Sequence, residues 1–192
     1  EGYSAAAYTH DAFGRQREVR YLDAQGNPTV CAAGYAGVRQ ERNALGYEIL
    51  RTYMDLEGRP YMLAQGYTSK ASGYDRFGRL VSEQYLNADG QLVCSHNGYA
   101  QSELVYDGMG RVIRRDYRNE YGQYAVSSSG YASVAYTRDA MDRVLHEVFY
   151  GADGSVQLQG SNYAAKQYAY DQRGNMIQEI FLDASGNRVN TG

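Results

Sequence analysis

The stretch GYTSKASGYDRFGRLVSEQYLNADGQLVCSHN at residues 66–97 decides the fold, because its pattern recurs along the whole chain. Units with the same key residues follow one another every 32 residues without insertion or deletion. The six units are 2–33, 34–65, 66–97, 98–129, 130–161 and 162–192. A fixed period of this length indicates a repeat protein, in which one unit cannot bury its apolar face alone and stacked units share a core. Positions below are counted from 1 to 32 within a unit.

The repeat explains an unusual composition of 21 Tyr and 22 Gly with no Trp. Four repeat positions, 2, 7, 9 and 20, hold 16 of the tyrosines. Position 2 is Tyr in every unit: Tyr3, Tyr35, Tyr67, Tyr99, Tyr131 and Tyr163. Position 25 is Gly in every unit: Gly26, Gly58, Gly90, Gly122, Gly154 and Gly186. Residues that recur without change are best explained by packing and turn geometry, so we predict a structural role for both sets.

Two turns are predicted in each unit, at positions 10–13 and 22–25. Both have Asp or Asn first and Gly fourth in most units, as in Asp75-Arg-Phe-Gly78 and Asn87-Ala-Asp-Gly90. The first side chain caps backbone N–H groups and the glycine takes a left-handed conformation. Asp142 replaces the glycine of the first turn in the fifth unit, and Asp tolerates that conformation better than most residues. We interpret both turns as hairpin turns that close with a glycine bulge.

The segments between the turns have strand lengths, so the chain is predicted to be all-β, with stacked β-hairpins that form a solenoid or a spiral sheet. Two strands of about eight residues and a shorter third segment are expected in each unit. The third segment centres on Val30, Met62, Cys94, Val126 and Leu158. Positions 16 and 20 have the same parity, so both are predicted to face the core. Parallel coils and antiparallel hairpins both remain possible.

Composition also limits the function. A net charge of −3 with scattered basic residues argues against nucleic-acid binding, which needs a basic face. No apolar run is long enough for a transmembrane helix. His10, His96 and His146 occupy different repeat positions, so no metal site and no cofactor are expected. Cys31 and Cys94 lie two units apart, too far for a disulfide between strands about 4.8 Å apart, so both thiols are predicted to be free.

No enzymatic motif is present. The strings Asn87-Ala-Asp-Gly90 and Gly151-Ala-Asp-Gly154 resemble the opening of a calcium loop, but the remaining ligands of such a loop are missing. Turn capping is the better interpretation of these carboxylates. We therefore predict that the chain is not an enzyme.

The candidate binding residues are tyrosines at the two variable positions, 7 and 9, with arginines beside the first turn. A tyrosine ring can stack on a sugar and hydrogen-bond its hydroxyls, whereas packing within the sheet is the alternative use of the same ring. The candidate ligand-binding residues are Tyr8, Tyr74, Tyr106, Tyr136, Tyr168, Tyr170, Arg79, Arg111 and Arg143.

The segments Tyr74-Asp-Arg-Phe-Gly-Arg-Leu80, Tyr106-Asp-Gly-Met-Gly-Arg-Val112 and Tyr170-Asp-Gln-Arg-Gly-Asn-Met176 resemble the YD-repeats, or RHS-type repeats, of bacterial surface and secreted proteins. The segment Tyr85-Leu-Asn-Ala-Asp-Gly-Gln-Leu-Val93 is similar to the hairpins of glucan- and choline-binding wall repeats and of clostridial toxin binding repeats. Those families use Trp for ligand contact, and this chain has none. The resemblances imply an exported bacterial repeat region, extracellular or at the cell surface, that binds or encloses.

Two functional hypotheses follow. The first is a non-catalytic binding or adhesion module that recognises carbohydrate or a partner protein through repeated weak sites, which avidity strengthens. The second is a structural spacer, filament or shell-forming region. The chain begins and ends inside repeats without polar caps, so we expect a segment of a longer protein that can self-associate through its uncapped ends.

Overall fold

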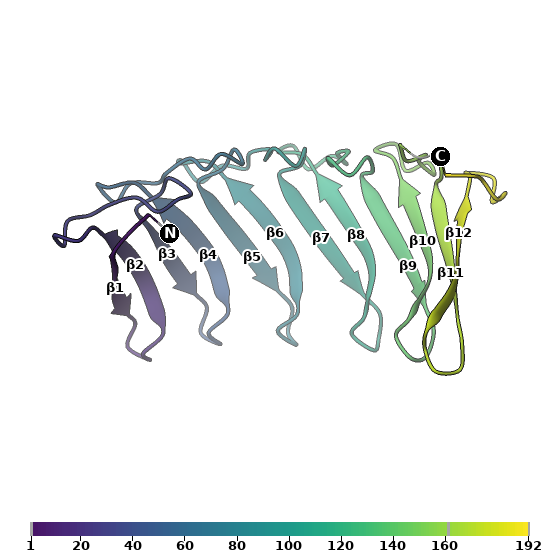
Figure 1. Cartoon of the computed structure of the whole chain (residues 1–192), viewed down its shortest axis with the longest axis horizontal. Helices are drawn as coiled ribbons and strands as arrows, with labels where there is room; N and C mark the ends of the chain where they lie inside the picture. Colours follow the sequence, from purple (N-terminus) through teal and green to yellow (C-terminus); the bar gives the residue numbers. More distant parts are fainter. Residues whose placement is uncertain (1, 161, 192) are drawn as a thin grey trace. The chain divides into compact units, whose positions relative to one another are not determined.

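The computed structural model describes residues 2–160 and 162–191, and all of its regular elements are β-strands (Figure 1). Residues 1, 161 and 192, which include the predicted ends of the fifth and sixth repeats, lie outside the described residues. The chain divides into two compact units, Glu1–His96 and Asn97–Gly192, which are described separately. From here on, "unit" means one of these two parts, and "repeat" means one of the 32-residue segments. Each unit contains three hairpins, and the all-β prediction is confirmed.

Each unit is an antiparallel meander in which strands follow their order in the sequence. The first unit contains β1 (Ala5–His10), β2 (Gln16–Leu22), β3 (Gly37–Arg42), β4 (Glu48–Met54), β5 (Ser69–Tyr74) and β6 (Leu80–Leu86). The second contains β7 (Gln101–Tyr106), β8 (Val112–Arg118), β9 (Ser133–Arg138), β10 (Val144–Tyr150), β11 (Ala165–Tyr170) and β12 (Met176–Leu182). Successive strands are antiparallel, so the alternative of parallel coils is excluded within each unit.

Pairing is longer within a hairpin than between hairpins. Strands β3 and β4 pair from Gly37–Met54 to Arg42–Glu48, whereas β2 and β3 pair only at Glu18–Arg39, Val19–Val38 and Arg20–Gly37. Toward the hairpin turns, neighbouring hairpins therefore have no ladder between them. In Figure 1 the hairpin turns of each unit lie at one end of its strands and the connecting loops lie at the other. We call each gap between consecutive hairpins of a unit a hairpin junction.

The turns at positions 10–13 are hairpin turns, as predicted, whereas those at positions 22–25 form but lead only to an isolated bridge and join no two strands. The Asp107 carboxylate accepts hydrogen bonds from the backbone N–H groups of Met109 and Arg111, at 2.9 and 3.0 Å. The backbone N–H of Gly110 donates to the Asp107 carbonyl at 3.0 Å, and Gly110 has a φ of +81°. Asp142 takes the same conformation in the fifth repeat, with a φ of +67°.

The position 16 core prediction is wrong in part, because a register shift follows each hairpin turn. In the first hairpin His10 pairs with Gln16 and Thr9 pairs with Glu18, so Arg17 has no partner across the strand. This extra residue breaks the alternation of faces on which the prediction rested. At the same position Ile49 is 36% exposed and Ile177 is 65% exposed, while Val81, Ile113 and Leu145 are half-buried.

The third predicted strand segment is also absent within the described residues. One isolated bridge per repeat, such as Met54–Pro60, replaces it, and Val30, Met62, Val126 and Leu158 are exposed. After the bridge the chain makes a further turn, which the sequence analysis missed. In this turn the Gly34 N–H donates to the Cys31 carbonyl at 2.9 Å.

The core of each unit contains a row of aromatic rings in contact, here called the aromatic ladder. Rings from positions 2 and 20 alternate along it, with centroids 4.4–6.3 Å apart in the first unit and 4.5–5.9 Å apart in the second. The ladder of the first unit consists of Tyr3, Tyr21, Tyr35, Tyr53, Tyr67 and Tyr85. That of the second consists of Tyr99, Tyr117, Tyr131, Phe149, Tyr163 and Phe181. Burial first, and then the neighbouring Tyr117, raise the pKa of the Tyr131 phenol to about 12.

A second buried row lies at position 3, where every residue but one is fully buried and small. Ala36, Ala100, Ala132 and Ala164 have no exposed surface, and Thr68 is 1% exposed. These residues lead into the first strand of each hairpin. Their backbone forms hydrogen bonds with the preceding hairpin: for example, the Tyr117 N–H donates to the Ala132 carbonyl at 2.8 Å.

Replacing Asp142 with glycine is expected to stabilise the protein. A left-handed L-residue costs roughly 1–2 kcal/mol, and the added flexibility of glycine offsets roughly 0.5–1 kcal/mol of that relief. The exposed ion pair of Asp142 with Arg138, at 3.3 Å, adds little. The expected gain is therefore about 0.5–1 kcal/mol in urea unfolding. The reverse change at the equivalent turn, Gly110→Asp, should lower stability by a similar amount, and equal stability of both variants would contradict the argument.

Candidate functional site

Four of the nine predicted binding residues, Tyr74, Tyr170, Arg111 and Arg143, link neighbouring hairpins at the junctions. At position 9 of three repeats, a long side chain reaches back to the preceding hairpin. The Tyr74 hydroxyl donates to the Glu48 carbonyl at 3.1 Å, and the Tyr170 hydroxyl donates to the Val144 carbonyl at 3.0 Å. Arg138 occupies the same repeat position, and its Nε–H donates to the Val112 carbonyl at 3.0 Å. Tyr and Arg thus close equivalent junctions with the same kind of bond.

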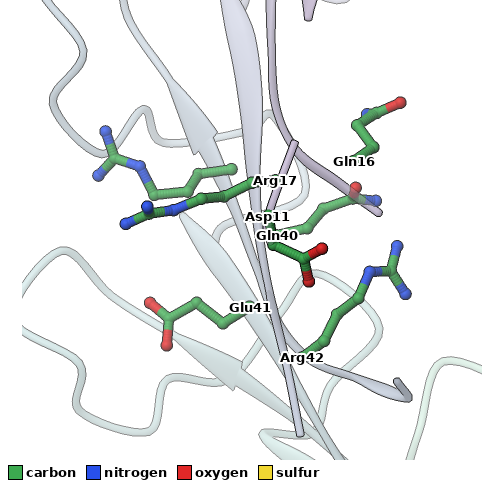
Figure 2. Close-up of a pocket in the computed structure, with 7 residues that line it drawn as sticks. Asp11, Gln16, Arg17, Gln40, Glu41 and Arg42 are labelled. Atoms are coloured by element: carbon green, nitrogen blue, oxygen red, sulfur yellow. The ribbon is translucent and has the colours of Figure 1, made fainter. Parts of the chain in front are cut away.

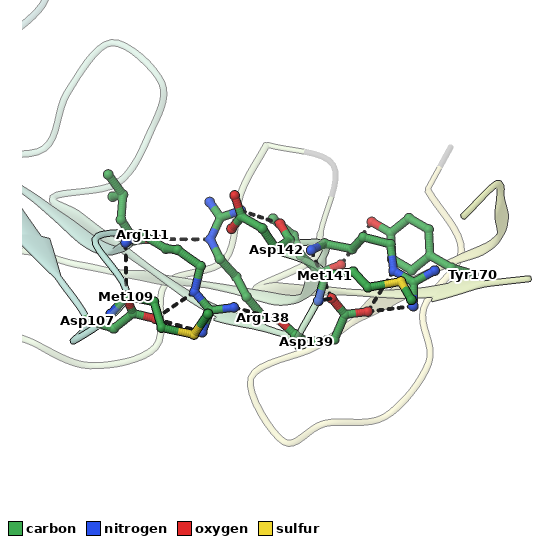
Figure 3. A network of polar contacts seen from close by, with 11 residues as sticks. Asp107, Met109, Arg111, Arg138, Asp139, Met141, Asp142 and Tyr170 are labelled. Carbon is green, nitrogen blue, oxygen red and sulfur yellow. Dashed lines mark hydrogen bonds and ion pairs between the residues drawn. The ribbon is translucent and has the colours of Figure 1, made fainter. Parts of the chain in front are cut away.

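Arginines beside the hairpin turns form a second link across the junction (Figure 3). Arg111 pairs with the Asp107 carboxylate at 2.7 Å and also donates to the backbone carbonyl of Asp139 in the next hairpin. Arg143 pairs with Asp139 at 2.6 Å and donates to the backbone carbonyl of Asp171 at 3.3 Å. Each of these arginines therefore joins its own turn to the following one.

Flat side chains stack within the same junctions. The Arg143 guanidinium lies 4.9 Å from the centre of the Tyr170 ring. In the first unit the Tyr47 ring, at the repeat position of Arg143, stacks on Tyr74 with centroids 4.9 Å apart. Residues next to the hairpin turn thus hold the side chain that bridges from the following hairpin.

Two tyrosines at position 7, Tyr136 and Tyr168, lie beside charged side chains of the preceding hairpin, Arg115 for Tyr136 and Glu147 for Tyr168. Tyr136 and Tyr168 are half-buried, and burial raises the pKa of both phenols. The negative charge of Glu147 raises both pKa values further. Both phenols therefore stay protonated in neutral solution and can donate a hydrogen bond.

The remaining candidate residues do not gather into one site. Tyr8 is 56% exposed on β1, whereas Tyr106 is half-buried on β7. Arg79 pairs with Asp75 at 2.6 Å and lies 5.0 Å from the centre of the exposed Phe77 ring. The candidates are thus divided between the strands, the junctions and the turns. A ligand-facing role for any of them remains a prediction.

The cysteines, the possible metal ligands and the possibility of a membrane-spanning helix were also considered in the sequence. Neither Cys31 nor Cys94 takes part in a disulfide, as predicted. Across residues 2–160 and 162–191, no three His, Cys, Asp or Glu side chains lie close enough together to hold a metal ion. In the same residues no helix is long and apolar enough to cross a membrane.

A row of exposed apolar residues, not predicted from the sequence, lies at position 12, the third residue of each hairpin turn. The row consists of Phe13, Leu45, Phe77, Met109 and Met141, which are 65–79% exposed, and Arg173 takes this position in the last repeat. In the turn at positions 22–25 the equivalent residue is polar in most repeats, as Gln25, Glu57 and Asp89 show. This contrast between otherwise similar turns was visible in the sequence.

No family model matches the chain. No curated protein matches it either. Among solved structures, it is similar to a chain of the Tc holotoxin pore of Photorhabdus luminescens that carries a mutation in TccC3, with 16% identity and a TM-score of 0.45 over 96% of this chain. It is also similar to a chain of the TcdB2-TccC3-TEV crystal structure (14% identity, TM-score 0.42, 98% of this chain). A third similar chain belongs to the TcdB2-TccC3 crystal structure (15% identity, TM-score 0.42, 94% of this chain). The present chain spans 9–12% of the length of these chains.

Proposed function

We propose that this chain is a non-catalytic structural repeat region, which forms part of the wall or spacer of a larger bacterial protein and meets protein partners there. The observation that carries the proposal is the use of the variable tyrosines and arginines to join one hairpin to the next. Tyr74, Arg138 and Tyr170 all donate to a backbone carbonyl of the preceding hairpin. Side chains that serve the fold in this way need no ligand to explain them.

The likeness to exported YD-repeats, noted from the sequence, supports an extracellular or surface location as part of the same proposal. The carbohydrate hypothesis has weaker support. Its ligand would need exposed rings, and among the six candidate tyrosines only Tyr8 is classed as exposed. Tyr74 and Tyr170 use their hydroxyls within the protein, which removes the polar tip that a sugar would contact.

The test compares stability and glycan binding in matched variants. Tyr170→Phe removes the hydroxyl that donates to the Val144 carbonyl and should lower the free energy of unfolding by about 0.5–1.5 kcal/mol. Tyr8→Phe is the control, because that hydroxyl belongs to an exposed residue, and its stability should match that of the unaltered chain. Urea unfolding measures both.

A glycan array with the unaltered chain and both variants completes the test. No binding across the panel, together with a loss of stability in Tyr170→Phe alone, supports the structural function. Glycan binding that either substitution abolishes, with stability unchanged in both variants, would overturn it and favour the carbohydrate hypothesis.

A further inference from the structure

We propose that Arg115, on β8, is a binding site for a carboxylate group of a protein partner. Most arginines of the chain pair with an acidic side chain. Among the described residues, the arginines that form no ion pair are Arg17, Arg76, Arg115, Arg173 and Arg188. All of these are exposed except Arg115, which is half-buried. Arg17 shows the exposed state, because it lines a pocket at the first hairpin junction, where water can hydrate its charge (Figure 2).

Arg51 occupies the same repeat position as Arg115, position 18, and it has an acidic partner. Its Nε–H donates to Glu48 Oε1 at 2.7 Å, and its Nη2–H donates to Glu48 Oε2 at 3.0 Å. One carboxylate therefore meets this guanidinium through both of its oxygens, which is the strong geometry for such a pair. Glu48 stands at position 15, where the fourth repeat has the uncharged Val112. The fourth repeat thus keeps the arginine and lacks the acid.

The two arginines have equivalent ring neighbours. Tyrosines at positions 2 and 20 of its own repeat lie beside each of them, namely Tyr35 and Tyr53 beside Arg51, and Tyr99 and Tyr117 beside Arg115. The Arg115 guanidinium also donates a hydrogen bond to the Tyr117 hydroxyl. A guanidinium carries several N–H donors, so donors remain for a carboxylate. The surroundings that hold Arg51 against its acid are therefore repeated around Arg115.

The residues that flank Arg115 across the strands do not neutralise its charge. Its cross-strand neighbours are Leu104 on β7 and Val134 on β9, and both are apolar. Tyr136 on β9 also lies beside it, and the acidic Glu147 on β10 lies beyond Tyr136, its own cross-strand partner. A half-buried guanidinium is thus surrounded by phenols and apolar groups, which is costly unless an anion from outside the chain supplies the missing charge.

A carboxylate has the chemistry that this place requires, because its two oxygens can accept from the guanidinium as those of Glu48 do at Arg51. Val112 has a smaller side chain than glutamate, and Arg115 keeps part of its surface exposed, so an acid can approach from solvent. The proposed function includes protein partners, and a carboxylate is the group that such a partner would present here. It occurs as the side chain of Asp or Glu and as the C-terminus of a chain.

The experiment follows the Nε–H signals of Arg115 and Arg51 in nitrogen–proton NMR spectra of the full chain, at about pH 6 and constant ionic strength. Propionate represents an acidic side chain, and N-acetylglycine represents a C-terminus. Each should shift the Arg115 signal with a dissociation constant on the order of 10–100 mM, as expected for one charge-assisted pair. The Arg51 signal is the internal control and should not move, because Glu48 already occupies that guanidinium. Propionamide resembles propionate without the charge, so its binding should be at least about tenfold weaker.

Two variants exchange the acid between the second and fourth repeats. Val112→Glu supplies Arg115 with the acid that Arg51 has, and it should abolish the shifts that both probes cause. Glu48→Val removes the acid from Arg51, whose signal should then respond to propionate as that of Arg115 does. A folded Glu48→Val chain in which the Arg51 signal stays unchanged would contradict the equivalence of the two positions. The probe series on the unaltered chain remains decisive if either variant fails to fold.

Saturable shifts with propionate or N-acetylglycine, abolished by Val112→Glu, support the proposal, and the tighter probe identifies the source of the carboxylate. No saturable shift with either acid, or an equal shift with propionamide, would overturn it. Inorganic phosphate that binds more tightly than both acids would also overturn it, because the site would then select a different anion. The stability of Tyr170→Phe does not depend on Arg115, so failure of this site and failure of the structural function can be told apart.

Discussion

Replacing Phe149 with alanine is expected to lower the free energy of unfolding by about 3–5 kcal/mol. The Phe149 ring is 6% exposed and lies in the middle of the second aromatic ladder. Its centroid is 4.9 Å from that of Tyr131 and 5.9 Å from that of Tyr163. The substitution removes buried apolar surface and breaks two ring contacts at once, so it separates the ladder into two parts.

Urea unfolding of the variant, followed by far-ultraviolet circular dichroism, measures this loss. Tyr121→Ala is the matched control, because that ring is 80% exposed in a turn and should change stability by less than about 0.5 kcal/mol. Similar losses in both variants would show that the ladder is not the main source of stability. Phe149→Leu should recover a large part of the loss, since it restores most of the buried volume.

Acid is expected to unfold the protein because many of its turns are capped by ionised carboxylates. The backbone N–H of Arg111, and then its side chain, lower the pKa of Asp107, and the backbone N–H of Asn187 does most to lower that of Asp183. The same direction of shift applies to nine turn residues, Asp11, Asp23, Asp55, Asp75, Asp107, Asp139, Asp153, Asp171 and Asp183. For Asp11, Asp55, Asp75 and Asp139, desolvation is the largest effect and raises the pKa, but the hydrogen bonds together outweigh it.

The direction of the pH effect follows from these lowered values. A carboxyl whose folded pKa is below its ordinary value of 3.8 stabilises the folded state above that pH. This stabilisation is lost as the pH falls through the folded pKa, because the unfolded chain then binds the protons first. The urea midpoint should therefore be nearly constant from about pH 7 to pH 5 and fall steeply below about pH 4.

The chain itself supplies the control for this prediction. Asn43 caps its hairpin turn with the same geometry, since its Oδ1 accepts from the Leu45 and Tyr47 N–H groups at 3.1 and 3.0 Å. A variant that combines Asp11→Asn, Asp75→Asn, Asp107→Asn and Asp139→Asn keeps these caps without the titrating groups. Its urea midpoint should fall less steeply in acid than that of the unaltered chain. An equal fall in both proteins would assign the acid effect to other carboxyls.

The hairpins could be predicted from the sequence because their causes are local. Asp107 and Gly110 determine a turn by capping and by backbone conformation, and neither effect depends on distant residues. The rings at positions 2 and 20 recur in every repeat, so their packing role was visible as a pattern. Even the exception, Asp142, follows from the conformational tolerance of its residue type.

The features that could not be predicted depend on the register of strand pairing and on side-chain contacts between neighbouring hairpins. A single extra residue, Arg17 in the first hairpin, reverses the faces assigned by counting, and nothing in its identity reveals it. The hydrogen bonds across the junctions could not be predicted because Tyr74 and Arg138 make the same contact with different side chains. Repeat position 9 therefore appears variable in the sequence.

The short strand pairing between hairpins has a consequence for how such a chain can change its length. Neighbouring hairpins are joined by three residue pairs and, in most junctions described above, by at least one side chain that donates to a backbone carbonyl. These contacts come from the same positions in successive repeats, so a duplicated repeat would find compatible neighbours on both sides. A partial repeat would not, because it would misalign every later junction. The fold therefore tolerates the gain or loss of whole repeats. The six repeats of this chain agree with this, because they follow one another without a single insertion or deletion.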